Sequence, residues 1–276
     1  MKYPIQKEYH SFKKFRERKK KAKAPVNRRI AVPSFFTLMN LFCGFLAIIS
    51  ISNGDLGRGA WLIALAGLFD VFDGLMARLA NATSDFGIEL DSISDMVSFG
   101  VAPGFLIYTW SMHELGFLGI MVSALPPLCG AVRLARFNVN ARLTPKKDNF
   151  IGLPIPAQAI ILGAFLLTFK DDMEVFTMFE NGVNSILIPL VIVISFLMVS
   201  TLPFDKIPRF DRTSIRENRG RIILFLVYLL LILTLQEYGL MVVFTIFIVK
   251  GMIDGAIQFF RDDYGPEGED QFQDYS

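Results

Sequence analysis

The sequence predicts an all-α fold: a polytopic membrane helix bundle of about eight transmembrane helices, with a basic amphipathic N-terminal segment. Hydrophobic residues make up 53% of the 276-residue chain, and the mean hydropathy is +0.45, which is too apolar for a soluble domain. The apolar residues gather in windows of roughly 17 to 25 residues, the length at which a helix crosses a bilayer. Lys and Arg lie mostly between these windows or close to their ends.

The windows follow one another along the whole chain. We expect helices over 30–52, 57–80, 91–110, 115–137, 154–170, 183–203, 220–236 and 239–260. Nearly all of the 28 Lys and Arg residues fall in the N-terminal tail and in alternate connections. Because basic residues favour the cytoplasmic ends of helices, we expect a multi-pass protein of the cell inner (cytoplasmic) membrane with both termini cytoplasmic.

Residues 1–29 form a basic cytoplasmic juxtamembrane segment with twelve Lys and Arg. Ile5, Tyr9, Phe12 and Phe15 recur there at near-helical spacing, which suits a helix lying on anionic lipid headgroups; the alternative is a simple topology anchor. No nucleic-acid recognition fold accompanies the charge, so no nucleic-acid partner is expected. One membrane domain follows over 30–260, and 261–276 is predicted to be an acidic, disordered tail.

The cysteines and histidines do not form a metal-binding pattern. Cys43 and Cys129 both lie inside hydrophobic windows, which favours packing over a disulfide or a metal site. His10 and His113 are isolated in the sequence. A metal ion in this chain is therefore expected to be held by carboxylates.

Four aspartates inside the predicted spans are the main candidate site: Asp70, Asp73, Asp91 and Asp95. Charged residues in a membrane helix cost about 2.5 to 3.5 kcal/mol each on insertion scales, so a group of them requires compensation. The first two are spaced i,i+3 and the last two i,i+4, so each pair projects from one face of its helix. Both pairs lie toward the cytoplasmic end and predict one cage of carboxylate oxygens.

The simplest compensation for four close carboxylates is one or two hard cations such as Mg²⁺, Mn²⁺ or Ca²⁺. Gly74 and Ala77 follow Asp70 on roughly the same helix face, where their missing side chains leave a slot. The alternative for these two residues is close helix packing, for which membrane proteins use small residues widely. Beside four aspartates, we expect the slot to admit a ligand.

The stretch reads Asp70-Val-Phe-Asp73-Gly74-Leu-Met-Ala77-Arg78, eight residues, Gly87, three residues, Asp91, three residues and Asp95. This resembles the signature of the CDP-alcohol phosphatidyltransferases at every defining position. The resemblance implies that Asp70, Asp73 and Asp91 bind two divalent ions, Mg²⁺ or Mn²⁺, and the diphosphate of a CDP-linked lipid. It also implies that Asp95, beside this metal set, is the catalytic base.

The resemblance also implies the residues that bind the CDP-lipid. The stretch from Pro33 to Gly44 is similar to the first-helix pattern of the family, in which Thr37 and Asn40 would approach the nucleotide and its phosphates, although Ser34 stands where relatives often have Asn. From the signature itself come the remaining candidates Gly74, Ala77, Arg78 and Gly87. Arg78 has the alternative role of a topology residue.

Three further stretches resemble the bacterial and archaeal phosphatidylserine synthase branch of this family: 91–103, 129–138 and 152–157. Serine carries a carboxylate, which a guanidinium can bind with two parallel hydrogen bonds. The resemblance therefore implies that Arg133 and Arg136, spaced i,i+3, and Asn138 bind L-serine. The alternative for both arginines is that they flank a membrane helix on its positive side.

The implied reaction transfers the phosphatidyl group from CDP-diacylglycerol to the hydroxyl of L-serine, giving phosphatidylserine and CMP. The same chemistry with glycerol 3-phosphate, an inositol phosphate or choline as acceptor stays open. A cation or solute transporter is a further alternative, because intramembrane carboxylates also line ion pathways; against it, the acids lie at one end of the helices and no inverted repeat is visible. A homodimer is common in the family.

Overall fold

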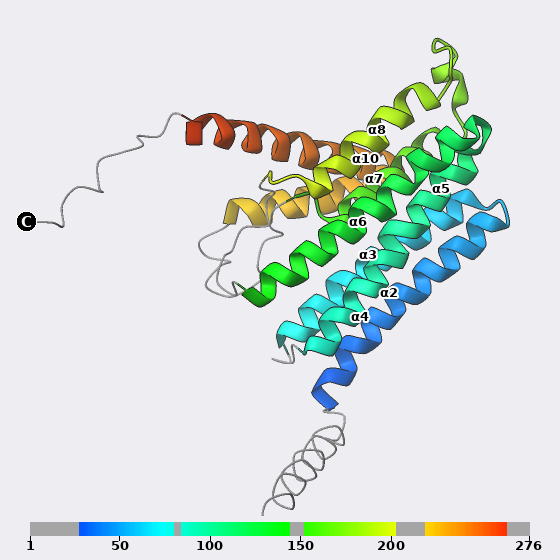
Figure 1. Ribbon diagram of the computed structural model, residues 1–276. Coiled ribbons are helices and arrows are strands. Elements are labelled where there is room, and N and C mark those ends of the chain that lie inside the picture. The colour runs from blue at the N-terminus through cyan, green and yellow to red at the C-terminus, as the bar shows by residue number, and fades with distance from the viewer. Residues whose placement is uncertain (1–27, 80–83, 144–151, 203–218, 264–276) are drawn as a thin grey trace, which may run out of the picture.

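The computed structural model describes residues 28–79, 84–143, 152–202 and 219–263, and these residues form helices without any strand. The all-α prediction is therefore confirmed. The predicted basic segment 1–29 falls almost entirely outside the described residues. The elements are α2 Arg28–Ser52, α3 Leu56–Leu79, α4 Asp85–Asp95, η1 Met96–Val101, α5 Ala102–Trp110, η2 Met112–Leu115, α6 Phe117–Leu143, α7 Ile155–Phe169, η3 Met173–Phe176, α8 Asn184–Val199 and α10 Arg219–Asp263. Figure 1 shows α2, α3, α5 and α6 side by side in one bundle.

A tight turn joins α2 to α3 as an antiparallel hairpin. Gly54 supplies the positive φ of 84° that this turn requires, and the Asp55 Oδ1 accepts a hydrogen bond from the Arg58 N–H at 3.0 Å, which caps α3. A Cβ on Gly59 would lie 2.5 Å from Ile51 Cγ1. The two helices can therefore approach closely only because position 59 has no side chain.

Helix α2 carries two opposite faces that the sequence spacing sets. Large apolar residues recur every three or four positions on the exposed face, as expected where a helix meets lipid: Phe35, Leu38, Phe42, Phe45 and Ile49. The buried face carries smaller and polar residues: Thr37, Asn40, Cys43, Ala47 and Ile51. Thr37 and Asn40 therefore point into the bundle.

Helix α3 has the same arrangement, and this positions its two aspartates. Its exposed face includes Trp61, Leu65, Leu68 and Val71, whereas Ala60, Ile63 and Ala66 are buried. Asp70 and Asp73 continue the buried row at helical spacing, and Asp73 is only 6% exposed. These carboxylates therefore point into the bundle interior and not toward the lipid.

Helix α4 begins at Asp85, six residues before the predicted start at residue 91. Ser84 caps it, because its Oγ accepts a hydrogen bond from the Gly87 N–H at 3.0 Å. The helix continues through the wider π turn η1 into α5. Pro103 lies just after η1, and a proline lacks an N–H and clashes with the carbonyl four residues earlier, which favours a wider turn at this point.

Helix α7 lies at the centre of the bundle. Twelve of its 15 residues are buried, and it packs against both α3 and α10. Helix α6 passes through Pro126 and Pro127 without interruption and ends at Leu143, beyond the predicted end at 137. The short turn η2 occupies the predicted beginning of this helix, and Gly116, with a φ of 57°, separates the two.

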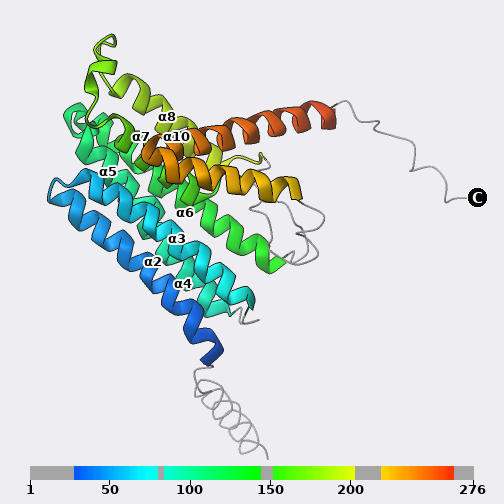
Figure 2. The same cartoon turned by 180° about the vertical axis from the view of Figure 1, so that it is seen from behind.

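The C-terminal region is one continuous helical element, α10, where the sequence predicted two helices divided near residues 237 and 238. A straight helix of 45 residues would be about 68 Å long, more than twice the hydrocarbon thickness. Figure 2 shows that the first and last parts of α10 run in different directions. The helix extends to Asp263, three residues past the predicted start of the tail, and the rest of the predicted tail lies outside the described residues.

Five described segments are long and apolar enough to cross a membrane: Ser34–Ser52, Leu56–Ala77, Asp85–Trp110, Phe117–Asn140 and Tyr238–Gly255. Helices α7 and α8 are apolar but shorter. The chain thus has the helices of a multi-pass membrane protein. The count of eight spans stays a prediction, because α7 and α8 fall below this length and the first half of α10 is not among the five.

Candidate functional site

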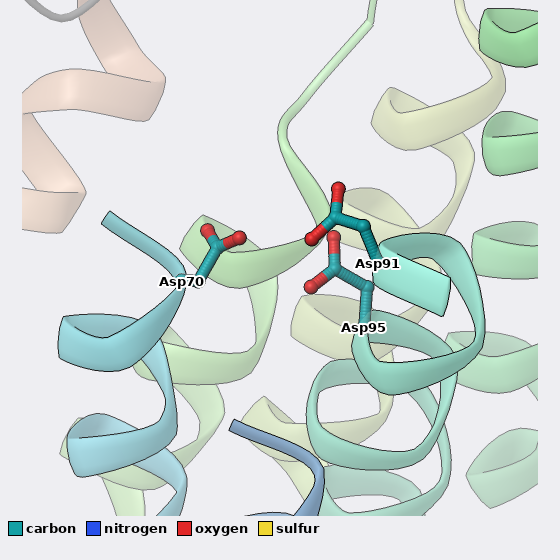
Figure 3. A group of neighbouring side chains, drawn as sticks. All are labelled: Asp70, Asp91 and Asp95. Carbon is teal, nitrogen blue, oxygen red and sulfur yellow. The ribbon is translucent and has the colours of Figure 1, made fainter. Parts of the chain in front are cut away.

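The four aspartates come together where α3 faces α4. One carboxylate oxygen each of Asp70, Asp91 and Asp95 lies within 4.8 Å of the other two. Figure 3 shows Asp91 and Asp95 pointing from one helix toward Asp70 on the facing helix. The Asp73 carboxyl lies within hydrogen-bonding reach of the Asp91 carboxyl, at the side of this group. We call these four residues the aspartate cluster.

Helix α2 supports the cluster from a third side. The buried Thr37 side chain hydrogen-bonds the Asp73 carboxylate, which the backbone of Gly74 also contacts. Asn40, which is fully buried, donates its Nδ2–H to Asp95 Oδ1 at 3.1 Å. Both α2 residues predicted to bind the CDP-lipid therefore contact the aspartate cluster directly.

Two serines fasten α4 and η1 to the backbone of α2. Ser94 Oγ donates to the Thr37 carbonyl oxygen at 3.1 Å, and Ser98 Oγ donates to the Asn40 carbonyl oxygen at 2.9 Å. The sequence analysis did not single out these serines. Their i,i+4 spacing is the signal that would have identified them, since small polar residues on one helix face commonly bond to a neighbouring helix in membranes.

Helix α6 places a cation against the cluster. Arg133 is buried, and its charge is attracted by Asp95 and Asp70 and repelled by Arg136. The Arg133 Nε has no hydrogen-bond partner among the described residues. This guanidinium is therefore near enough to Asp95 and Asp70 to interact with their charge, and its Nε is available as a donor for a ligand.

Arg136 has different partners from Arg133. Its Nη1 donates to the Val199 carbonyl oxygen at 2.8 Å and its Nη2 to the Ser200 carbonyl oxygen at 3.0 Å. These carbonyls end α8, where the last turn of a helix leaves its acceptors without intrahelical partners. Both forked nitrogens are thus used to hold α8 against α6.

Asn138 lies one turn beyond Arg136 and contacts α4. Its Nδ2 donates to Ser92 Oγ at 2.9 Å, while its Oδ1 is buried without a hydrogen-bond partner among the described residues. Ser92 directly follows Asp91 in the chain. Of the three residues predicted to bind serine, Arg133 interacts with the charge of the aspartate cluster. Arg136 instead contacts the end of α8, and Asn138 contacts α4.

The remaining signature residues lie along the same helices. Gly74 and Ala77 are half-buried on α3 just beyond Asp73. Gly87 lies in the first turn of α4, and a Cβ there would lie 3.2 Å from Ser84 Oγ, so its small size serves the helix cap. The side chain of Arg78 lies outside the described residues.

Unsatisfied polar atoms are concentrated at this site. Buried polar atoms in proteins nearly always have hydrogen-bond partners. Within the described part of the chain, half of the buried side-chain atoms that lack one belong to the site: Asn40 Oδ1, Asp73 Oδ2, Asp91 Oδ1, Arg133 Nε and Asn138 Oδ1. Carboxylate and amide oxygens are the ligands of hard divalent cations. The donor set therefore fits a divalent ion, and the charge of Arg133 fits an anionic ligand.

Comparison with known proteins points to the same kind of site. A family model described as CDP-alcohol phosphatidyltransferase matches residues 30–199. A CDP-diacylglycerol–serine O-phosphatidyltransferase of Helicobacter pylori (strain ATCC 700392 / 26695) is 33% identical over 229 residues, which cover 83% of this chain and 92% of that protein.

Two other relatives extend the comparison to a second bacterium and an archaeon. A CDP-diacylglycerol–serine O-phosphatidyltransferase of Bacillus subtilis (strain 168) is 35% identical over 189 residues, or 68% of this chain and 97% of that protein. An archaetidylserine synthase of Methanothermobacter thermautotrophicus (strain ATCC 29096 / DSM 1053 / JCM 10044 / NBRC 100330 / Delta H) is 37% identical over 182 residues, or 64% of this chain and 71% of that protein.

Proposed function

Because the chain belongs to the CDP-alcohol phosphatidyltransferase family, we propose that it transfers the phosphatidyl group of CDP-diacylglycerol to L-serine, giving phosphatidylserine and CMP. The aspartate cluster is the observation that carries this proposal, because it brings carboxylate oxygens of three signature aspartates, Asp70, Asp91 and Asp95, within 4.8 Å of one another. The names of the bacterial and archaeal relatives share serine as the acceptor group, which favours serine over the other alcohols.

The reaction replaces one bond to phosphorus with another. The serine hydroxyl oxygen bonds to the phosphorus that carries diacylglycerol, the bond from that phosphorus to the CMP oxygen breaks, and the hydroxyl proton leaves to a base. Asp95 is this base in our proposal, because it is buried at the centre of the cluster. Its Oδ1 already accepts a hydrogen bond from Asn40, so we favour Oδ2 as the oxygen that accepts the proton.

The chain's own residues would hold two divalent ions, Mg²⁺ or Mn²⁺. Asp70, Asp73 and Asp91 are the principal ligands, and Asp95 lies close enough to Asp70 and Asp91 to share one ion. When bound, such ions neutralise charge on the diphosphate oxygens and on the departing CMP. The fit rests on Asp73 Oδ2 and Asp91 Oδ1, which are buried without a hydrogen-bond partner among the described residues.

The CDP-lipid would lie against α2 and α3. Thr37 and Asn40 border the cluster from α2, and the small residues Gly74 and Ala77 leave room along α3 for the nucleotide diphosphate. We assign Arg78 and Gly87, at the end of α3 and the start of α4, to the same ligand. The acyl chains then extend toward the lipid that surrounds these helices.

For serine we favour Arg133 as the residue that binds the carboxylate, because it is buried beside the cluster and its Nε has no partner within the described chain. Asn138 Oδ1 is a free acceptor and suits the serine ammonium. Arg136 contributes less directly, because its two Nη atoms already bind backbone carbonyls of α8.

The deciding experiment supplies purified protein with CDP-diacylglycerol, Mn²⁺ or Mg²⁺, and serine, glycerol 3-phosphate, an inositol phosphate or choline. Mass spectrometry of the lipid product and measurement of CMP release are the readouts. We expect phosphatidylserine and CMP with serine only. If another alcohol gives product and serine gives none, that alcohol is the acceptor. If the protein moves a cation or solute across proteoliposomes without releasing CMP, it is a transporter and not an enzyme.

The variant Asp95→Asn tests the role of the base. Because general base catalysis contributes about 10²- to 10⁴-fold to rate, we expect turnover to fall by that order while Mn²⁺ and CDP-diacylglycerol still bind. Retained turnover with lost CDP-diacylglycerol binding would instead make Asp95 a ligand residue.

The membrane arrangement is part of the proposal. We place the domain 30–260 in the cell inner membrane, with both termini and the aspartate cluster on the cytoplasmic side. The distribution of Lys and Arg supports this orientation. We place the basic segment 1–29 on anionic headgroups. Labelling of single introduced cysteines from either side of oriented vesicles tests this arrangement. Assembly as a homodimer, expected from the family, is tested by the mass of the protein in detergent.

A further inference from the structure

Asn40 has a contact that a residue serving only as a nucleotide ligand does not need. It is fully buried on α2, and its Nδ2 donates to Asp95 Oδ1 at 3.1 Å. Asp95 also belongs to the group of carboxylates that lie within 4.8 Å of one another. Distance alone therefore makes Asp95 as good a metal ligand as Asp70 or Asp91.

The amide hydrogen bond distinguishes Asp95 from those two residues. A carboxylate has two oxygens, and a divalent cation can bind one or both of them. The Asn40 amide uses one lone pair of Oδ1 and fixes its direction, which leaves Oδ2 as the less engaged oxygen for a metal ion or a proton. Asp70 carries no comparable amide contact among the described residues, and Asp91 Oδ1 is unpartnered.

The backbone around this hydrogen bond is held on both sides. Ser98 Oγ bonds the carbonyl oxygen of Asn40 itself at 2.9 Å, and Ser94 Oγ bonds the carbonyl oxygen of Thr37 one turn earlier at 3.1 Å. A Cβ on Gly44 would lie 2.8 Å from Ser98 Cα, so the helix backbones are in close contact there. These contacts hold the backbone of α2 against α4 and η1 on both sides of the Asn40 amide.

From this geometry we infer that Asn40 is a positioning residue, which holds the Asp95 carboxylate by one oxygen and keeps it from joining the metal ligands with both. The inference rests on the proposed function in so far as Asp95 is the base. In this inference, Asn40 is the residue that separates the role of Asp95 from that of the metal-binding aspartates. Positioning of Asp95, and not nucleotide binding, is then the main role of Asn40.

The variants Asn40→Leu and Asn40→Ala test this inference. Leu has as many side-chain heavy atoms as Asn and preserves the packing, whereas Ala leaves a cavity; both remove the donated hydrogen bond. Because misplacement of a catalytic group by about 1 Å can cost roughly 10²-fold in rate, we expect kcat to fall about 10- to 100-fold in both variants. The KM for serine and the Kd for CMP in the presence of Mn²⁺ should stay within about threefold, as both ligand sites remain.

Cys43→Ala is the matched control, since Cys43 is buried on the same face of α2 and lies outside the site. It should retain wild-type kcat. A wild-type kcat for Asn40→Leu together with a low kcat for Asn40→Ala would show that Asn40 only fills space. If Asn40→Leu raises the Kd for CMP tenfold or more and leaves kcat unchanged, Asn40 binds the nucleotide and the inference is wrong.

A second readout does not depend on turnover. If Asn40 restrains Asp95, the Asn40→Leu variant frees Asp95 Oδ1 for the ion, and Mn²⁺ should bind about three- to tenfold more tightly, because carboxylate oxygens set the affinity of such sites. The gain should vanish in Asn40→Leu/Asp95→Asn. Electron paramagnetic resonance of Mn²⁺ measures the affinity of both variants.

The two possible failures can be told apart. Unchanged Mn²⁺ affinity in Asn40→Leu overturns the inference even if the proposed reaction proves correct. Tighter Mn²⁺ binding in a protein inactive on serine supports the inference even if that reaction proves wrong.

Discussion

Asn138 on α6 donates a hydrogen bond to Ser92 on α4 at 2.9 Å, and Ser92 in turn donates to the Ile88 carbonyl oxygen at 3.0 Å. Because Ser92 directly follows Asp91, this bridge holds one of the clustered carboxylates at a fixed place relative to the helix that carries Arg133. A helix outside the cluster thus contributes to its geometry.

The two polar atoms of Asn138 can be tested separately. Asn138→Asp keeps an oxygen acceptor for the serine ammonium but loses the donor to Ser92, whereas Asn138→Ala loses both. Since one hydrogen bond contributes about 1 kcal/mol, we expect the KM for serine to rise about fivefold in Asn138→Ala only. Thermal stability should fall in both. The exposed Val139→Ala is the control, and an equal serine KM in all three variants would remove Asn138 from the serine site.

The two arginines of α6 should respond to substitution in opposite ways. Lysine keeps the charge but cannot reproduce the planar fork. We expect Arg136→Lys to lower the apparent Tm by roughly 2 to 4 °C, because the carbonyls of Val199 and Ser200 lose a shared donor, with the KM for serine within twofold. Arg133→Lys should raise that KM about tenfold with little change in Tm.

Differential scanning fluorimetry and steady-state kinetics on the two purified variants decide this pair of expectations. The opposite pattern, in which Arg136→Lys raises the KM for serine and leaves the Tm unchanged, would make Arg136 the serine-binding residue.

Glycine 44 determines how closely α2 approaches η1. A Cβ there would lie 2.3 Å from Ser98 Oγ, which is closer than atoms can pack, so Gly44→Ala must push the helices apart. We expect a drop of about 1 to 3 kcal/mol in the free energy of unfolding, the range for overpacking, and a lower kcat because the Asn40–Asp95 contact lies beside it. Gly57→Ala is the control, since its nearest atom would be 3.5 Å away; equal Tm values for the two variants would contradict the close contact.

Removal of divalent ions should abolish the activity reversibly. Dialysis against EDTA leaves the carboxylates without their counter-charge, and we expect turnover to return when Mn²⁺ or Mg²⁺ is added. Titration of the stripped protein with Mn²⁺ should show two ions per chain in the wild type and weaker binding in Asp70→Asn or Asp91→Asn. Full turnover in EDTA would rule out the proposed ligand role of the cluster.

Helical spacing made the position of the aspartates predictable. The i,i+3 and i,i+4 spacings place Asp70 with Asp73 and Asp91 with Asp95, because a helix returns to the same face at these intervals. The apolar residues on the opposite faces, such as Leu68 and Val71, orient these faces inward. Both signals are local, so one sequence is sufficient to read them.

Features that depend on polar helix ends or distant partners were not predictable in this way. The window of apolar residues missed the first turns of α4, because Asp85 and Glu89 are polar although Ser84 caps a helix there. The hydrogen bonds of Arg136 reach carbonyl oxygens 63 and 64 residues further along the chain, and hydropathy contains no information on such pairing.

The π turn η1 also has a consequence for the inheritance of insertions and deletions. Because a π turn accommodates an additional residue relative to an α-helix, deletion of one codon within Met96–Val101 would let this stretch close into a regular helix. Because the wider turn absorbs that residue, Asp91 and Asp95 would keep nearly the same direction relative to α5, whereas removal of one residue from regular α-helix would turn them by about 100°. A one-residue deletion within Met96–Val101 should therefore disturb the aspartate cluster less than a one-residue deletion inside α5 or α6 disturbs its own helix.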